Sequence, residues 1–206
     1  TETVRQLVKK HIPHWSKGIL NVTGVRLSVE GLDNIPKDGP CVFVANHRSY
    51  YDIPLLLAGL DEPYGILAKE ELGKIPLLNR WMKLLGCVFV QRDDVRASVR
   101  ALNDATAIVE SGRSFIIFPE GTRSPQPLPG PFKSGIWRLM REFPEVELIP
   151  VYLENLHRSM PKGALLPVPT MCSVRFGAPL PHSVDDSKEE FLERARTAVI
   201  SLAREL

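Results

Sequence analysis

The stretch CVFVANHRSYYDIPLLLAGL, residues 41–60, decides the fold class. Its first part, residues 41–46, is a short continuous apolar run, which is typical of a strand buried on both faces. Residues 52–60 have the pattern of a helix, with Asp at the start and Pro in the first turn. A buried strand that leads through a short turn into a helix is the repeating unit of α/β proteins.

The same alternation continues along the chain. Residues 25–31 alternate like a strand, and further strand patterns occupy residues 64–69, 87–92, 114–121, 146–154 and 172–180. Helical patterns occupy residues 76–86, 94–112 and 187–206. Ser187 and Glu190 have the spacing of a capping box at the start of the last helix. We therefore predict an α/β fold with a single domain, residues 21–206, in which helices flank a mostly parallel or mixed sheet.

The composition fits one globular domain without a nucleic-acid partner. The chain has 206 residues, 44% of them hydrophobic and 24% charged, and its formal net charge of +2 is too small to indicate nucleic-acid binding. Cys41, Cys87 and Cys172 stand singly in apolar surroundings without the spacing of a metal site, so we expect buried, reduced thiols, as in a cytosolic protein. No apolar run approaches the ~20 residues that a membrane-spanning helix needs.

Residues 1–20 have the pattern of an amphipathic helix. Apolar residues recur every three or four positions and basic residues fall off that stripe: Val4, Val8, Ile12, Trp15 and Ile19 against Arg5, Lys9, Lys10 and Lys17. We expect Pro13 to kink or split this helix. A basic amphipathic helix with a Trp can dock on an anionic membrane, but the same pattern suits a helix packed on its own domain. The pattern alone favours neither interpretation.

His47 and Asp52 lie between the strand and the helix of the opening stretch. A neutral imidazole is well matched to removing a proton near neutral pH, and a carboxylate at its second nitrogen fixes the tautomer and stabilises the imidazolium. The structural alternative is a turn residue followed by an Asp that caps the helix. Both can hold together, because a carboxylate has two oxygens that accept hydrogen bonds.

A second polar cluster, FPEGTRS at residues 118–124, follows a later strand. Gly121 lets backbone N–H groups approach a ligand closely, and Arg123 and the Thr122 hydroxyl are suited to phosphate oxygens. Glu120 would orient Arg123 or contact a ligand hydroxyl. The alternative is a turn held together by an internal Glu–Arg pair.

Two further cations stand at predicted strand ends. Arg92 closes an apolar strand, which would aim its side chain at a site, whereas Lys69 has a similar place but is followed by Glu70 and Glu71. Sites in α/β folds form at the carboxyl ends of the strands, so we expect both cations near His47 and Glu120.

In this combination and order, the motifs resemble those of the glycerolipid acyltransferases of the 1-acylglycerol-3-phosphate acyltransferase type. The first block of that family is H-x-x-x-x-D, here His47 to Asp52, and the third is FPEGTRS. The second runs from AKEELGKIP to VFVQR (68–92), the fourth is LIPVYLE (148–154), and PFKSG (131–135) also resembles the family. Together the blocks are specific, although none is so alone.

The resemblance implies an O-acyltransferase. His47 would deprotonate the free hydroxyl of a lysophospholipid, 1-acylglycerol-3-phosphate, and the alkoxide would attack the thioester of acyl-CoA or of acyl carrier protein. Asp52 would orient His47, and Lys69 or backbone N–H groups would stabilise the oxyanion. The phosphate of the acceptor would be bound by Arg92, Glu120, Gly121, Thr122 and Arg123. Neither a metal ion nor another cofactor is implied, and no nucleophilic Ser or Cys.

Because lysophospholipid and product reside in bilayers, the resemblance also implies a site that opens at a membrane surface. Residues 1–20 would then be a peripheral docking helix on the cytoplasmic face of the membrane. The alternatives are an acyltransferase for another lysolipid such as a lyso-aminolipid, a non-catalytic lipid-binding module, and a metal-dependent hydrolase that uses His47 and Asp52. The last has little support, because apart from the pair His11 and His14 the other histidines lack ligand spacing.

Overall fold

The computed structural model describes residues 2–49, 51–60, 64–76, 78–91, 95–124, 126, 128–160, 164 and 166–204. Seven strands form one sheet in the order β1-β7-β6-β2-β5-β3-β4. Their bounds are β1 Arg26–Glu30, β2 Cys41–Ala45, β3 Gly65–Lys69, β4 Val88–Val90, β5 Phe115–Ile117, β6 Glu147–Glu154 and β7 Met171–Phe176. The pairing of β6 with β7 is antiparallel and the other pairings are parallel, which confirms the predicted mixed sheet.

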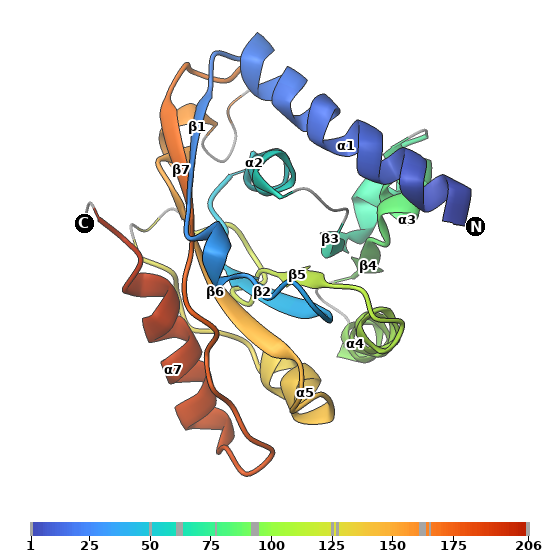
Figure 1. The fold of residues 1–206 in the computed structure, drawn as a ribbon, viewed down its shortest axis with the longest axis vertical. Helices are drawn as coiled ribbons and strands as arrows, with labels where there is room; N and C mark the ends of the chain where they lie inside the picture. Colours follow the sequence, from blue (N-terminus) through green and yellow to red (C-terminus); the bar gives the residue numbers. More distant parts are fainter. Residues whose placement is uncertain are drawn as a thin grey trace.

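Helices cover both faces of this sheet (Figure 1). One side carries α1 Glu2–Val22, α2 Asp52–Gly59 and α3 Leu78–Leu85, and the other carries α4 Val95–Glu110, α5 Gly135–Glu142 and α7 Lys188–Ile200. A short helix, α6 Leu156–Ser159, follows β6, and two 3-10 turns are η1 Leu32–Asn34 and η2 Glu70–Lys74. The predicted α/β class with flanking helices is therefore confirmed.

The central strand β2 shows why this stretch decides the fold. Its side chains are buried on both faces: Phe43 packs with the core under α1 and α2, and Val42 and Val44 pack with the core under α4, α5 and α7. A strand that is apolar at every position can be buried only between two helical layers.

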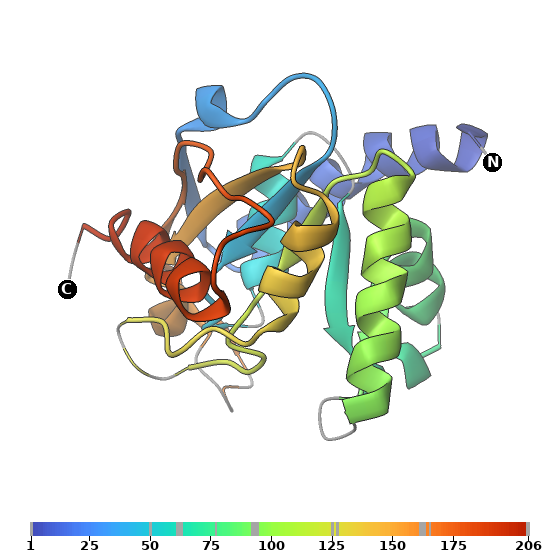
Figure 2. The same cartoon turned by 90° about the horizontal axis from the view of Figure 1, so that it is seen from below.

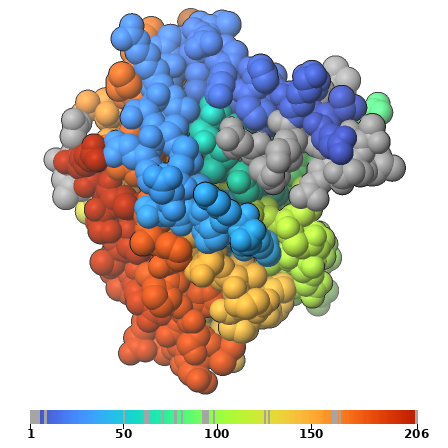
Figure 3. All heavy atoms as spheres, in the orientation of Figure 1, coloured from blue at the N-terminus to red at the C-terminus, as the bar shows by residue number. Residues whose placement is uncertain are grey.

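The N-terminal helix α1 is continuous through Pro13, so the expected split does not occur. Ile12, Ser16 and Leu20 are buried on its inner side, at a spacing of four residues. This packing outweighs the one backbone hydrogen bond that proline removes. Figure 3 shows the helix lying along the upper surface of the molecule.

The parallel strands β2, β3, β4, β5 and β6 all end at the same edge of the sheet. Strand β3 pairs with β5 only at Gly65 and Ile66 and pairs with β4 from Leu67 onward, so β3 and β5 separate toward this edge. Figure 2 shows the arrow of β3 pointing to the end of the molecule where the segment after β5 lies, with η1 at the opposite end.

The cysteines have no disulfide partners. Cys41 and Cys172 are buried as expected, whereas Cys87 is only half-buried. Burial raises the pKa of the Cys41 and Cys172 thiols to about 11 and that of Cys87 to about 12.

Ser187 caps α7 as its sequence pattern predicts. Its hydroxyl oxygen accepts a hydrogen bond from the backbone N–H of Glu190 at 3.3 Å. The helix ends at Ile200, earlier than the helical pattern of residues 187–206 suggests.

Within the described residues, no helix is both long enough and apolar enough to cross a bilayer.

Candidate active site

His47 and Asp52 form a direct pair at the end of β2. The imidazole Nδ1 of His47 lies 2.6 Å from Oδ2 of Asp52, whose side chain is fully buried. The side chain of His47 is 12% exposed, and no described residue forms a hydrogen bond with its Nε2. One ring nitrogen is therefore held by a carboxylate while the other is left for a ligand.

Asp52 does not cap its helix through its side chain, which corrects the helix-cap interpretation. It is the first residue of α2, and the capping position is held by Tyr51. Its carboxylate turns back instead and accepts hydrogen bonds from the backbone N–H groups of Arg48 at 2.7 Å and Ser49 at 3.1 Å. Because Pro54 lacks an N–H, the first turn of α2 has one donor fewer that needs a cap.

Two buried contacts fix the segment that carries His47. The side chain of Asn46 exchanges hydrogen bonds with the backbone of Leu153 in β6, at 3.0 and 2.7 Å. The ring of Phe118 stacks against the imidazole of His47, with 4.5 Å between the ring centroids. These contacts restrict the imidazole to one orientation toward Asp52.

Glu120 joins the two motifs. Its Oε1 accepts from the backbone N–H of His47 at 2.8 Å, and its Oε2 accepts from that of Gly130 at 3.0 Å. In addition, the backbone N–H of Ser124 donates to the carbonyl of His47 at 2.9 Å. Burial raises the pKa of the Glu120 carboxyl, although both amide hydrogen bonds oppose that shift. The sequence did not predict these contacts of Glu120 with backbone N–H groups, because a motif does not specify which N–H group of another segment will lie next to its carboxylate.

Gly121 forms the turn after Glu120. Its φ of +69° lies in the left-handed region, and its N–H donates to the carbonyl of Phe118 at 3.0 Å. Thr122 beside it is exposed and Arg123 is half-buried. These three residues lie between Glu120 and Ser124, both of which form hydrogen bonds with the backbone of His47.

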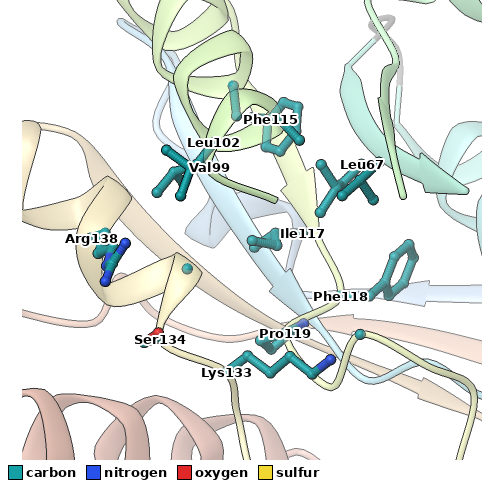
Figure 4. Close-up of a pocket in the computed structure, with 15 residues that line it drawn as sticks. Leu67, Val99, Leu102, Phe115, Ile117, Phe118, Pro119, Lys133, Ser134 and Arg138 are labelled. Atoms are coloured by element: carbon teal, nitrogen blue, oxygen red, sulfur yellow. The ribbon is translucent and has the colours of Figure 1, made fainter. Parts of the chain in front are cut away.

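Lys133 lies across this turn and was given no role by sequence reasoning. Its backbone N–H donates to the carbonyl of Pro119 at 2.9 Å, and a Cβ placed on Gly121 would lie 2.8 Å from the Lys133 Nζ. Figure 4 shows the Lys133 side chain extending beside Pro119. Its ammonium group makes no ion pair with any residue that the structure describes. The PFKSG motif, residues 131–135, was the available signal.

Of the other two predicted cations, Lys69 and Arg92, the structure describes only the backbone position of Lys69. Lys69 is the last residue of β3, at the edge of the sheet where β2 also ends. Arg92 lies outside the described residues.

Two apolar pockets lie on opposite faces of the sheet next to this site. One, of about 290 Å³, lies between α4, β5 and the start of α5, and its wall includes Phe118, Gly121 and Lys133 (Figure 4). The other, of about 490 Å³, lies between α1, α2 and α3, and its wall includes Trp15, Ile53 and Pro54. The first pocket therefore touches the residue that stacks on His47, and the second touches the residue that follows Asp52.

A metal-binding cluster is not found in the described part of the chain, where no three His, Cys, Asp or Glu side chains gather.

Residues 26–154 match the sequence model of the Acyltransferase family. The chain belongs to this family. It is 36% identical over 140 residues to a chloroplastic 1-acyl-sn-glycerol-3-phosphate acyltransferase, BAT2, of Brassica napus, covering 68% of this chain and 40% of that one. It is 31% identical over 144 residues to the 1-acyl-sn-glycerol-3-phosphate acyltransferase of Borreliella burgdorferi, covering 70% of this chain and 57% of that one.

A solved structure of the family has the same fold. The crystal structure of the 1-acyl-sn-glycerophosphate acyltransferase PlsC from Thermotoga maritima superposes with a TM-score of 0.85 at 32% identity. The match covers 100% of this chain and 84% of PlsC. The resemblance inferred from the motifs is therefore confirmed at the level of family and fold.

Proposed function

We propose that this acyltransferase moves a fatty acyl group from acyl-CoA or acyl carrier protein to the free hydroxyl of 1-acylglycerol-3-phosphate, giving phosphatidic acid. The observation that carries the proposal is the 2.6 Å contact of His47 with Asp52, held beside the FPEGTRS turn by Glu120. The names of the Brassica, Borreliella and Thermotoga relatives support the choice of acceptor.

The chemistry follows from the tautomer that Asp52 favours. A carboxylate at Nδ1 accepts the Nδ1–H, so Nε2 is the free acceptor that takes the proton of the hydroxyl. The hydroxyl oxygen then forms a bond to the thioester carbon. When the resulting tetrahedral intermediate collapses, the carbon–sulfur bond breaks, and the thiolate receives the proton from Nε2 of His47. The proposed reaction thus consumes no net proton and involves no acyl-enzyme.

The phosphate of the acceptor needs donors and positive charge close to Nε2. We assign this role to Gly121, Thr122, Arg123 and Arg92, with Glu120 holding their turn against His47. Lys133 joins this group, since its ammonium lies over Gly121. A backbone N–H group or Lys69 is assigned to the oxyanion of the tetrahedral intermediate.

The two apolar pockets suit a reaction that joins two acyl chains on one molecule. They lie on opposite faces of the sheet, one lined by Phe118, which stacks on His47, and the other by Ile53, which follows Asp52. In the proposed complex, one pocket takes the chain of the acceptor and the other takes the chain of the donor.

The lysophospholipid acceptor and the phosphatidic acid product both reside in a bilayer. The proposal therefore includes peripheral docking on the cytoplasmic face of a membrane. Residues 1–20, most of α1, are the proposed docking element, with residues 21–206 as the catalytic domain. The helix leaves Trp15 and Leu7 exposed and carries basic residues such as Lys10 and Lys17 on its exposed surface.

The purified protein tests this function in an acyl-transfer assay over a grid of lysolipids and acyl-CoA chain lengths, with acyl carrier protein as a second donor. We expect the highest kcat/KM with 1-acylglycerol-3-phosphate. Preference for a lyso-aminolipid would replace the acceptor, and vesicle binding without transfer from any donor would favour a lipid-binding module.

A further inference from the structure

Five large apolar side chains away from the His–Asp pair are exposed at one rim of the molecule. They come from α1 and from residues 166–171, which lead into β7, and each is 50–89% exposed: Trp15, Val22, Leu166, Val168 and Met171. We call these five residues the apolar rim. A soluble surface scatters such residues singly, whereas a continuous group marks an interaction site.

The two parts of the rim lie against each other. Arg26, which follows α1, donates its backbone N–H to the carbonyl of Thr170 at 3.0 Å and pairs in register with Met171. A Cβ on Gly24 would lie 3.0 Å from the side chain of Pro169. Trp15 and Val22 are seven residues apart, which places them on the same side of α1.

The rim is at the edge of the sheet that holds His47. Strand β7 is antiparallel to β6, so its first residue, Met171, lies where β6 ends. Two hydrogen bonds connect the rim to the His47 segment through consecutive residues: Ser49 Oγ donates to the carbonyl of Met160 at 2.8 Å, and Val168 N–H donates to that of Ser159 at 2.8 Å. A partner seated on the rim would therefore sit beside the site.

The charge around the rim selects the kind of partner. All 24 Asp and Glu residues of the chain lie outside residues 3–29 and 155–174, the two segments that build the rim. Those segments carry the basic residues Arg5, Lys9, Lys10, Lys17, Arg26, Arg158 and Lys162. Two segments that carry exposed apolar side chains and basic residues but no Asp or Glu match the surface of an anionic bilayer.

We propose that the apolar rim inserts into an anionic lipid bilayer, so that α1 is not the only membrane contact and the His47 edge faces the lipid. This inference deepens the proposed function. It rests on that function only for the role of the membrane contact, which is to bring the active site to its lipid substrate. Trp15 also lines the 490 Å³ pocket, so lipid at the rim would have an apolar path to the residues after Asp52.

Vesicle co-sedimentation of the full chain tests the insertion without any substrate. The test variant is Leu166→Ser with Val168→Ser, and the control is Leu32→Ser, a residue of similar chemistry that is 46% exposed in η1 at the opposite edge. On phosphatidylglycerol-containing vesicles we expect the double variant to bind about tenfold or more weakly and the control to bind like wild type. Equal binding of the double variant and wild type would overturn the proposal.

A fluorescent label reports insertion directly. Leu166→Cys and Leu32→Cys would each carry an environment-sensitive dye, because the native thiols are buried or half-buried and react slowly. We expect a blue shift on anionic vesicles for Leu166→Cys alone. If the dye at position 166 shows no blue shift although the protein is bound to vesicles, the proposal is contradicted. It is also contradicted if the protein self-associates without lipid and Leu166→Ser with Val168→Ser abolishes that self-association.

Activity separates this inference from the proposed function. In detergent micelles we expect the double variant to keep its kcat, whereas His47→Ala should bind vesicles like wild type. If neither wild type nor the variants transfer an acyl group, but vesicle binding still depends on Leu166 and Val168, the proposed function is refuted and the proposed membrane insertion of the rim stands.

Discussion

The Glu120 carboxylate accepts a hydrogen bond from the backbone N–H of His47 at 2.8 Å, although the two residues are 73 positions apart in the chain. Its other oxygen binds the N–H of Gly130, so one side chain ties the His–Asp segment to the turn proposed for phosphate. The geometry of the site therefore depends on a residue that need not touch the substrate.

Glu120→Gln should reduce kcat and stability. The carboxamide has one acceptor oxygen, so the N–H of His47 or of Gly130 loses its partner, at a cost of about 1–3 kcal/mol in the free energy of unfolding. Urea unfolding and acyl-transfer kinetics check this. Exposed Glu145→Gln is a matched control, and wild-type kcat and stability in Glu120→Gln would contradict the positioning role.

Wild type and Glu120→Gln should also differ in how their free energy of unfolding depends on pH. Burial raises the pKa of Glu120 above its ordinary value of 4.5, so the native chain binds this proton more tightly than the unfolded chain does. The contribution of Glu120 is thus fully present below 4.5 and is lost as pH rises through the raised pKa. We expect the unfolding free energy of wild type to fall relative to Glu120→Gln over this range. A relative rise would show that the shift has the opposite sign.

Arg123→Ala should mainly weaken binding of the acceptor. Loss of a charge-assisted hydrogen bond to phosphate predicts a rise of about tenfold or more in the KM for 1-acylglycerol-3-phosphate, with a smaller change in kcat. A neutral monoacylglycerol serves as the control acceptor, whose KM should not change. An unaltered KM for the phosphorylated acceptor would remove Arg123 from the phosphate site.

Lys133→Met keeps an apolar stem over Gly121 and removes the charge. We expect a higher KM for the phosphorylated acceptor, partial restoration in Lys133→Arg, and no effect from Arg138→Met, an exposed cation elsewhere on the same pocket. Steady-state kinetics measure all three. If Lys133→Met and Arg138→Met behave alike, Lys133 has no special place at the turn.

Asp52→Asn should lower kcat by at least about tenfold, yet by less than His47→Ala. The carboxamide has one acceptor oxygen in place of two and carries an NH2 donor, and an NH2 facing Nδ1 would favour the tautomer whose Nε2 is protonated. The variant also loses acceptors for Arg48 and Ser49, so unfolding must be measured beside kinetics, with exposed Asp38→Asn as the control. Reduced stability at full activity would leave Asp52 a purely structural role.

Much of the fold could be predicted because the relevant signals are local. The continuous burial of residues 41–45 and the capping of α7 by Ser187 each follow from a few neighbouring residues. The continuity of α1 could not, because it depends on burial of Ile12, Ser16 and Leu20 against the rest of the domain. Tertiary packing overrides the tendency of Pro13 to break a helix.

In the active site, too, features set by neighbouring residues could be predicted more readily than features set by tertiary packing. The meeting of His47 and Asp52 was predictable because only four residues separate them. The backward turn of the Asp52 carboxylate, the bridge made by Glu120 and the position of Lys133 over Gly121 were not. The first is a local contact with the backbone of Arg48 and Ser49, but an Asp at the start of a helix indicates a cap just as well. The other two contacts depend on how separate segments pack, which no single motif encodes.

The central claim is that His47 is the general base of acyl transfer. Transfer of a labelled acyl chain to 1-acylglycerol-3-phosphate by His47→Ala tests it most directly, with His14→Ala, an exposed histidine of α1, as the control and circular dichroism to verify folding. We predict that folded His47→Ala loses a factor of about 10²–10⁴ in kcat while His14→Ala stays near wild type. Wild-type turnover by a folded His47→Ala protein would contradict the account.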